Sequence, residues 1–231
     1  MTRRNQLRDA WQRVTTDVAE QCVRHGRDPA DVTVIAVTKG HCVEDIGLLA
    51  ELGVTDVCES RDSEARDKRE HMSDVALRWH CIGQVQTNKA AKVVTWADVV
   101  HSVDRPNLAS ALARAVPPGR TLEVLLQVNT EEADAGDPQP GRGGIGPASL
   151  PDLVRQVEAL PQLSIAGLMT VAPTAGAPGP GFRLVAGLLA ELRTTHPQAR
   201  MLSAGMSGDY AEAIAAGATH LRIGTAILGS R

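Results

Sequence analysis

Val124-Leu125-Leu126-Gln127-Val128, the end of the run Leu122–Val128, is apolar almost without alternation. Strands with one solvated face alternate apolar and polar residues, so such a run is typical of a parallel strand covered on both faces. Seven other short apolar or β-branched runs indicate further strands, at Val32–Val37, Thr55–Cys58, Leu77–Ile82, Ala97–His101, Leu163–Leu168, Arg200–Ser203 and Thr219–Ile223.

A segment with helical character follows nearly every predicted strand. Eight βα units in 231 residues predict a (β/α)8 barrel, also called a TIM barrel. A helix is expected before the first strand, from Thr2 to His25, with Gly26 ending it. Its apolar stripe consists of Leu7, Trp11, Val14, Val18 and Cys22. We expect one barrel domain over residues 1–231; a doubly wound open sheet is the competing architecture.

The composition argues against several classes of partner. The formal net charge is −3 and aromatic residues make up only 2% of the chain, which disfavours binding to nucleic acid or to an acidic membrane surface. No apolar run is long enough to span a bilayer, and no secretory signal follows the charged N-terminus. The four cysteines lack CxxC spacing, so we expect reduced thiols in a cytoplasmic protein, with neither disulfides nor a metal site.

Two segments rich in glycine and proline interrupt the alternation. Glu131 to Pro147 follows the fifth predicted strand, and Ala172 to Gly181 follows the sixth. On a barrel both lie at the C-terminal face, where barrel enzymes keep their sites. A surface insertion explains either segment equally well.

Lys39 follows the first predicted strand and precedes Gly40, which places an amine at the C-terminal face of the barrel. A lysine that forms a Schiff base must lose its proton, and partial burial or nearby cations favour that loss by lowering its pKa. From position alone, a surface lysine at a strand end is the simpler interpretation.

The last two predicted strands lead into segments that suit a phosphate. Strand seven is followed by Gly205-Met206-Ser207-Gly208, and strand eight by Gly224-Thr225. Barrels often bind phosphate in these two loops, glycines let the backbone approach an anion, and Ser207 adds a hydroxyl donor. Either segment alone could simply shape a turn. Together with Lys39 they indicate a phosphorylated aldehyde held as a Schiff base, and pyridoxal phosphate is the obvious candidate.

Arg222 lies inside the eighth predicted strand, where a charge is costly unless it is paired. We expect its side chain to point into the site and, with a pyridine cofactor, to donate to the ring nitrogen. Arginine keeps its proton, so that nitrogen would stay unprotonated and the cofactor would be a poor electron sink. A structural ion pair with a nearby carboxylate is the alternative.

Other polar residues have simple structural interpretations. His80, in the third predicted strand, fits a core histidine better than a catalyst. Ser102, at the end of the fourth, suits a helix cap or a ligand contact. Thr87 or Asn88 is expected to cap the following helix.

Together these residues resemble the pyridoxal phosphate homeostasis protein family, whose members are single-domain relatives of the alanine racemase N-terminal barrel. The matching segments run through the chain in order and are Ile35–Lys39, Trp79–Lys89, His101–Asp104, Gln127–Asn129, Gly167–Thr170, Gly205–Tyr210 and Arg222–Ile227.

The resemblance implies a fold-type III barrel that holds pyridoxal phosphate on Lys39. It implies that Arg222 meets the pyridine nitrogen. It implies that Ser207, Gly224 and Thr225 contact the phosphate. It also implies that Met206 and Asn88 lie near the cofactor.

The sequence departs from the family pattern beside this predicted site. Where the family has Phe-Gly-Glu-Asn, this chain has Val57-Cys58-Glu59-Ser60, which changes volume and hydrogen bonding. Leu228-Gly229 replaces a Phe-Gly pair near the end. The loop Glu131–Pro147 keeps Arg142-Gly143-Gly144 and otherwise diverges.

Three functions stay open. A two-base racemase needs a second acid/base group, which a second-domain tyrosine supplies in full-length alanine racemases. This chain ends at Arg231, and its only tyrosine, Tyr210, lies on the phosphate side. We therefore expect a monomer that binds, buffers or delivers pyridoxal phosphate without robust catalysis, with apo-enzymes or amino acids as partners. A weak amino-acid racemase and a barrel aldolase using Lys39 are the alternatives.

Overall fold

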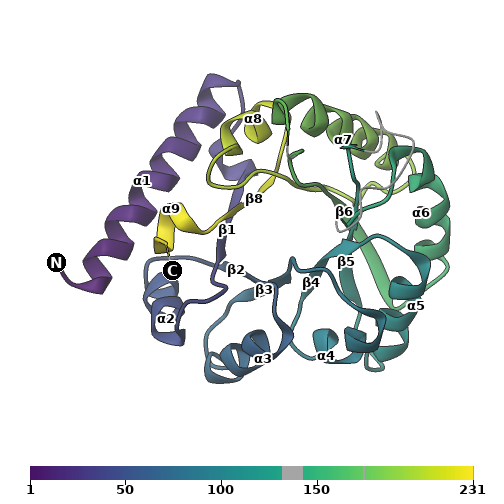
Figure 1. The fold of residues 1–231 in the computed structure, drawn as a ribbon, viewed down its shortest axis with the longest axis horizontal. Coiled ribbons are helices and arrows are strands. Elements are labelled where there is room, and N and C mark those ends of the chain that lie inside the picture. Colours follow the sequence, from purple (N-terminus) through teal and green to yellow (C-terminus); the bar gives the residue numbers. More distant parts are fainter. Residues whose placement is uncertain (132–142, 174, 231) are drawn as a thin grey trace.

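The computed structural model describes residues 1–131, 143–173 and 175–230. Within them, eight parallel strands close into a barrel in which neighbours in the chain are neighbours in the sheet and β1 pairs with β8. Figure 1 shows the strands in the centre with helices around them. The strands are β1 Thr33–Val37, β2 Asp56–Glu59, β3 Arg78–Cys81, β4 Val99–Val103, β5 Leu122–Gln127, β6 Leu163–Met169, β7 Met201–Ser203 and β8 His220–Ile223. The predicted barrel is confirmed, and the open sheet is excluded.

Helices separate the strands along the described chain. The α-helices are α1 Arg3–Arg24, α2 Val43–Glu51, α3 Asp62–His71, α4 Ala90–Val94, α5 Pro106–Ala115, α6 Leu150–Glu158, α7 Pro178–Leu192, α8 Tyr210–Ala215 and α9 Thr225–Leu228. Short 3-10 helices lie at η1 Pro29–Asp31, η2 Thr87–Lys89 and η4 Pro147–Ser149. No helix in the described ranges is both long and apolar enough to cross a membrane.

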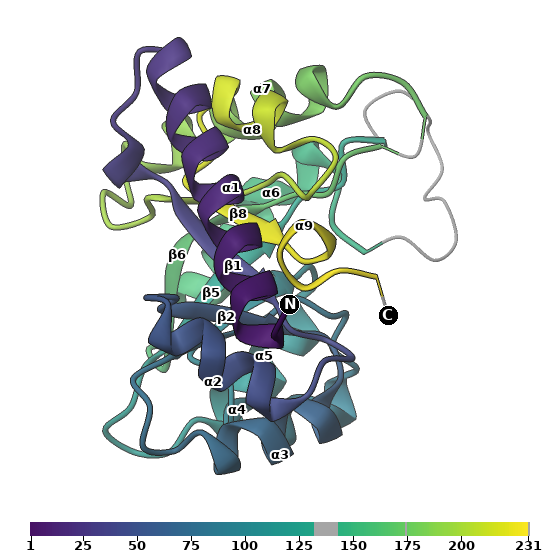
Figure 2. The same cartoon turned by 90° about the vertical axis from the view of Figure 1, so that its left-hand side faces the viewer.

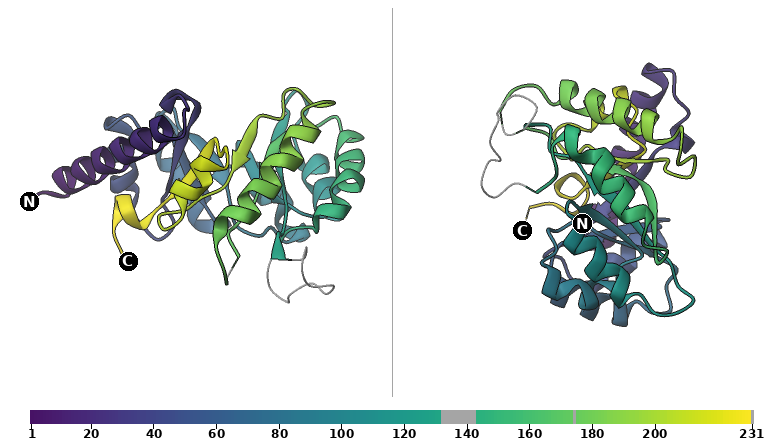
Figure 3. Two further views of the ribbon diagram at one scale, coloured as in Figure 1. Left: turned by 90° about the horizontal axis from the view of Figure 1, so that it is seen from above. Right: turned by 90° about the vertical axis from the view of Figure 1, so that its right-hand side faces the viewer.

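The additional N-terminal helix α1 is confirmed. The Thr2 hydroxyl caps it by accepting from the N–H of Asn5, and Gly26 follows it with a φ of +67°. The predicted stripe is buried except for Trp11, which is half-buried and packs at the edge. In Figures 2 and 3, α1 lies along the outside of the barrel beside α9, with both termini on this side. Arg3 fixes α1 to α2 through two hydrogen bonds to Asp45, at 2.7 and 2.6 Å.

Only the fourth strand differs notably from its predicted bounds, because it begins and ends two residues later than expected. Its register against β5 shifts between Val100 and Val103, an irregularity that apolar patterning does not predict. Ser102 therefore lies inside β4, is buried, and donates to the carbonyl of Gly83 at 2.6 Å. The expectation of a helix cap at Ser102 is wrong, since α5 begins after Arg105; a ligand contact by Ser102 stays a prediction.

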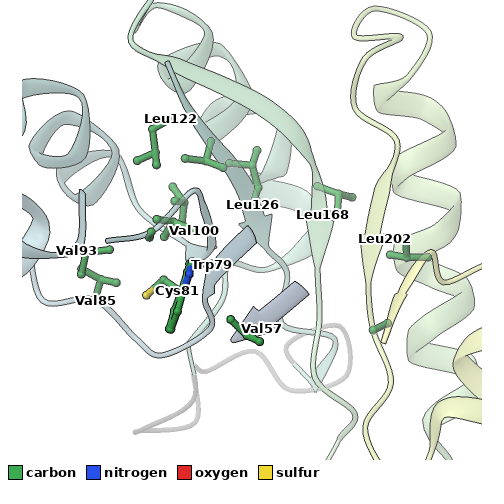
Figure 4. Packing of buried hydrophobic residues seen from close by; sticks show 14 of the residues in the cluster. Val57, Trp79, Cys81, Val85, Val93, Val100, Leu122, Leu126, Leu168 and Leu202 are labelled. Atoms are coloured by element: carbon green, nitrogen blue, oxygen red, sulfur yellow. The ribbon is translucent and has the colours of Figure 1, made fainter. Parts of the chain in front are cut away.

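The strands have two differently filled faces. Figure 4 shows the outward-facing cluster, where Val57, Trp79, Val100, Leu126 and Leu202 pack with residues from the surrounding segments. Because successive strand residues point to opposite faces, the intervening residues point into the barrel. Part of that interior is apolar, formed by Val99, Leu125, Ala166, Met169 and Met201. The rest is polar and contains Asp56, His80, His101, Ser203 and Arg222, all buried.

Candidate functional site at the ends of β1, β7 and β8

A pocket of about 310 Å³ lies at the carboxyl ends of β1, β7 and β8. Five of the predicted site residues line it: Met206, Ser207, Arg222, Gly224 and Thr225. The other lining residues are Val37, His41, Gly208, Gly229 and Ser230. His41 was missed by sequence reasoning, and its only signal is that it lies two residues beyond Lys39.

The loop after β7 presents backbone donors to this pocket. Within the described residues, the N–H groups of Ser207 and Gly208 donate to no other protein atom. Gly205 makes the turn possible, with a φ of +90° and only 2.7 Å between a built Cβ and the Cβ of Ala213. Donors without a protein acceptor at the rim of a pocket suit an anionic oxygen.

The loop after β8 closes the other side. The Ser207 hydroxyl accepts from the N–H of Ala226 at 3.5 Å, which joins the two loops. Gly224 packs directly on β1, since a Cβ at this position would lie 3.1 Å from the Cβ of Val37. The glycine therefore fits the close approach of β8 to β1 at the pocket without displacing Val37.

Arg222 lines the pocket and is only 3% exposed. Its Nη1 donates to the Ser203 hydroxyl at 2.6 Å and its Nη2 to the Thr170 carbonyl at 2.9 Å. Both acceptors are uncharged oxygens. Within the described residues Arg222 therefore forms no structural ion pair, which was the alternative interpretation. Burial lowers the pKa of Arg222. A guanidinium has five N–H groups, so Arg222 keeps donors for a further acceptor.

Lys39 lies in the turn after β1, half-buried, at the same end of the barrel. Burial raises the pKa of the Cys58 thiol, while the charges of Arg222 and Lys39 oppose that rise. The two cations therefore act on one buried thiol.

A buried charged network holds the residue before Lys39. Lys68 donates to the Thr38 carbonyl at 2.8 Å and to Glu59 Oε1 at 2.7 Å. The Thr38 hydroxyl donates to the same Glu59 oxygen at 2.7 Å. Burial raises the pKa of Glu59, against the hydrogen bonds from Lys68 and Thr38.

The network also reaches the residue after Lys39. Glu64 accepts from Lys68 at 2.6 Å and from the Gly40 N–H at 2.5 Å. Both backbone neighbours of Lys39 are thus anchored. Sequence reasoning missed this arrangement, although the spacing of Glu64 and Lys68 by four residues on one helix was an available signal.

Asn88 lies in η2, is exposed, and is absent from the lining of this pocket. No side chain caps η2, so the expected cap from Thr87 or Asn88 is wrong. His80 is fully buried and hydrogen-bonded to Asp56 and His101, in line with the core-histidine interpretation. All four cysteines are free, and only Cys42 is exposed.

Most of the segment Glu131–Pro147, including Arg142, lies outside the described residues. Its described end packs on the barrel, where Gly143 accepts from Gln127 at 2.8 Å and the Gly144 N–H donates to Asp104 at 3.2 Å. In the second interrupting segment, Thr174 also lies outside the described residues.

The fold and the strand-end pocket define a barrel of the alanine racemase N-terminal type. The sequence family described as alanine racemase, N-terminal domain, matches residues 19–231. The alanine racemase of E. faecalis superposes with a TM-score of 0.66 at 22% identity, over 94% of this chain and 58% of that one. A pyridoxal phosphate homeostasis protein of Corynebacterium glutamicum is 38% identical, over 90% of this chain and 94% of the relative.

The PLP-bound structure of PipY from Synechococcus elongatus superposes with a TM-score of 0.78 at 34% identity, over 92% of this chain and all of that one. The chain belongs to the pyridoxal phosphate homeostasis protein family.

Proposed function

We propose that this chain binds pyridoxal phosphate as a Schiff base on Lys39 and acts in intracellular pyridoxal phosphate homeostasis. The observation that carries the proposal is an amine and a pocket with free backbone donors at one end of one barrel. Pyridoxal phosphate supplies an aldehyde for the amine and an anion for the pocket. The structure of PipY with PLP bound, from a relative of the same fold, supports the same ligand.

The residues divide into contacts for each end of the ligand. Ser207, Gly224 and Thr225 suit the phosphate, because they line the pocket beside the free N–H groups of the β7 loop. Arg222 suits the pyridine nitrogen, because its remaining N–H groups are fixed donors. Met206 lines the pocket and is 40% exposed, which suits a contact with the pyridine ring of the ligand. For Asn88 the proposal rests on the family resemblance.

The tyrosine that a two-base racemase would need as its second acid/base group is poorly placed for that role. Tyr210 is the only tyrosine of the chain, and its hydroxyl donates to Asp17 on α1. Burial and this hydrogen bond raise the pKa of Tyr210 to about 12. A phenol held in this way suits no proton transfer near neutral pH, which favours a cofactor-binding role over efficient racemisation.

A weak amino-acid racemase is the second candidate, favoured by the match to the alanine racemase N-terminal domain. It predicts exchange of the α-proton of an amino acid in heavy water, lost in Lys39→Ala. Absence of exchange with every common amino acid would exclude it.

Chemical trapping tests the proposed function. Purified protein is mixed with pyridoxal phosphate, reduced with borohydride, digested and analysed by mass spectrometry. We expect the modification on the peptide that contains Lys39, unchanged in Lys89→Ala, which removes an exposed lysine. Labelling spread over surface lysines, or trapping of a phosphorylated sugar instead, would reject the proposal.

A further inference from the structure

Five of the polar side chains inside the barrel form one continuous series of hydrogen bonds. Asp56 Oδ1 lies 2.8 Å from His80 Nε2, and His80 Nδ1 lies 2.8 Å from His101 Nε2. His101 Nδ1 lies 3.0 Å from the Ser203 hydroxyl, which lies 2.6 Å from Arg222 Nη1. The series starts at the first residue of β2 and ends at the pocket.

The direction of every hydrogen bond in this series follows from its two ends. Arg222 has only donors, so Ser203 accepts from it and the Ser203 hydroxyl proton is left for His101 Nδ1. His101 must then carry its proton on Nε2 and donate to His80 Nδ1. His80 in turn carries its proton on Nε2 and donates to the Asp56 carboxylate. Every hydrogen bond in the series then joins one donor to one acceptor, and both histidines are neutral.

The opposite direction fails at two places. If His101 donated from Nδ1, the Ser203 hydroxyl would accept twice, and its own proton would have no acceptor among the described residues. The bare Nε2 of His80 would then face the Asp56 carboxylate unless an additional proton were bound. Buried polar groups without partners are strongly disfavoured, so the first arrangement is the stable one.

The electrostatic surroundings agree with neutral imidazoles. Burial lowers the pKa of His80 against the effect of Asp56, and burial together with His80 and Arg222 holds the pKa of His101 well below its usual value. Burial raises the pKa of Asp56, but the hydrogen bonds from His80 and Thr55 outweigh it and leave that pKa below its usual value. A carboxylate terminal acceptor is therefore available.

We propose that Asp56, His80, His101 and Ser203 form a one-directional hydrogen-bond chain that holds the Arg222 guanidinium in place at the pocket. These four are positioning residues, since none of them lines the pocket and each acts through the next. The chain fixes which N–H groups of Arg222 remain for a ligand. Its effect on pyridoxal phosphate rests on the proposed function, whereas its proton positions do not.

The test reads His101 after a change at the far end of the chain. Ligand-free protein with ¹⁵N-labelled histidine is studied by long-range ¹H–¹⁵N NMR, with His80→Gln and His101→Gln used for assignment. The wild type should show both histidines neutral with the proton on Nε2. Asp56→Ala leaves the His80 Nε2–H without its acceptor, so the His80 Nε2 signal should shift. His101 should keep its proton on Nε2, because Arg222 and Ser203 still fix the direction from the other end. Asp56→Asn keeps an acceptor oxygen and should keep the wild-type pattern.

Matched variants separate positioning from general packing. Ser203→Ala removes the donor to His101 Nδ1, so the Nδ1 signal should shift while the proton stays on Nε2. Pyridoxal phosphate binding should weaken about fivefold, the effect of one ordinary hydrogen bond. Ser203→Thr keeps the hydroxyl and should restore both. Val99→Ala, in the apolar part of the interior, should alter neither.

The outcomes distinguish the two proposals. A charged histidine, an Nδ1 proton on His101 in the wild type or in Asp56→Ala, or a His80 Nε2 signal that is the same in Asp56→Ala and wild type overturns the chain, even if pyridoxal phosphate binds. The expected proton pattern in a protein that fails to bind pyridoxal phosphate supports the chain and rejects the proposed function.

Discussion

Ser207, in the loop after β7, accepts a hydrogen bond at 3.5 Å from the backbone N–H of Ala226 in α9. This contact joins the two loops that line the pocket, and it leaves the Ser207 hydroxyl proton and the N–H groups of Ser207 and Gly208 as donors. Ser207 therefore links the two loops, and under the proposed function it also donates to the phosphate.

Ser207→Ala should weaken pyridoxal phosphate binding about fivefold, because it removes one hydroxyl hydrogen bond of ordinary strength. Binding of pyridoxal, which lacks the phosphate, should change less than twofold by the same reasoning. Equilibrium titration followed by absorbance measures both. Equal losses for the two ligands would contradict a phosphate contact.

Arg222→Met should weaken binding of pyridoxal phosphate more strongly, by about tenfold to a hundredfold, because a charged donor is lost. The change also leaves Ser203 and Thr170 without their donor, so the free energy of unfolding should fall too. Arg155→Met, at an exposed arginine, serves as the control in both measurements. An affinity equal to that of wild type would exclude Arg222 from the site.

Lys68→Met should lower the free energy of unfolding by about 3–5 kcal/mol, because the buried Glu59 loses its cation. The double variant Lys68→Met with Glu59→Gln should recover part of that loss. Urea denaturation provides the values, with Lys92→Met as the exposed control. A loss below about 1 kcal/mol, as expected for a surface pair, would show that the network does not support the Lys39 turn.

His220→Gln should reduce the acid sensitivity of the fold. Burial lowers the pKa of His220 from its ordinary 6.5 to about 4. Between these values the unfolded chain binds the proton and the folded chain does not, so stability rises with pH and is lost as pH falls. The shift corresponds to about 3 kcal/mol. The slope of stability against pH in this window should flatten in His220→Gln and stay unchanged in His25→Gln, at an exposed histidine.

The barrel and much of the pocket could be predicted because local patterns determine them. Apolar runs without alternation indicate strands covered on both faces, as at Leu122–Gln127. Glycines mark the two loops after β7 and β8; Gly205 is required by its positive φ and close packing, and Gly224 lies tightly against Val37. These signals need only a few neighbouring residues.

The missed features depend on contacts between distant residues. His101 and Ser203 are 102 positions apart, and Lys68 reaches Thr38 from a different element. Ser102 lies inside β4, whose register against β5 shifts between Val100 and Val103. Asn88 has a family motif around it, yet its side chain is exposed in the structure. Strand register and side-chain direction determine these contacts, and neither composition nor periodicity predicts them.

The visible absorption spectrum of the purified protein with pyridoxal phosphate, compared with that of Lys39→Ala, tests the Schiff base on Lys39 most directly. We expect a yellow band in the wild type that is absent from Lys39→Ala. A wild type that gains no such band on addition of pyridoxal phosphate, or a variant that keeps the band, would contradict the account.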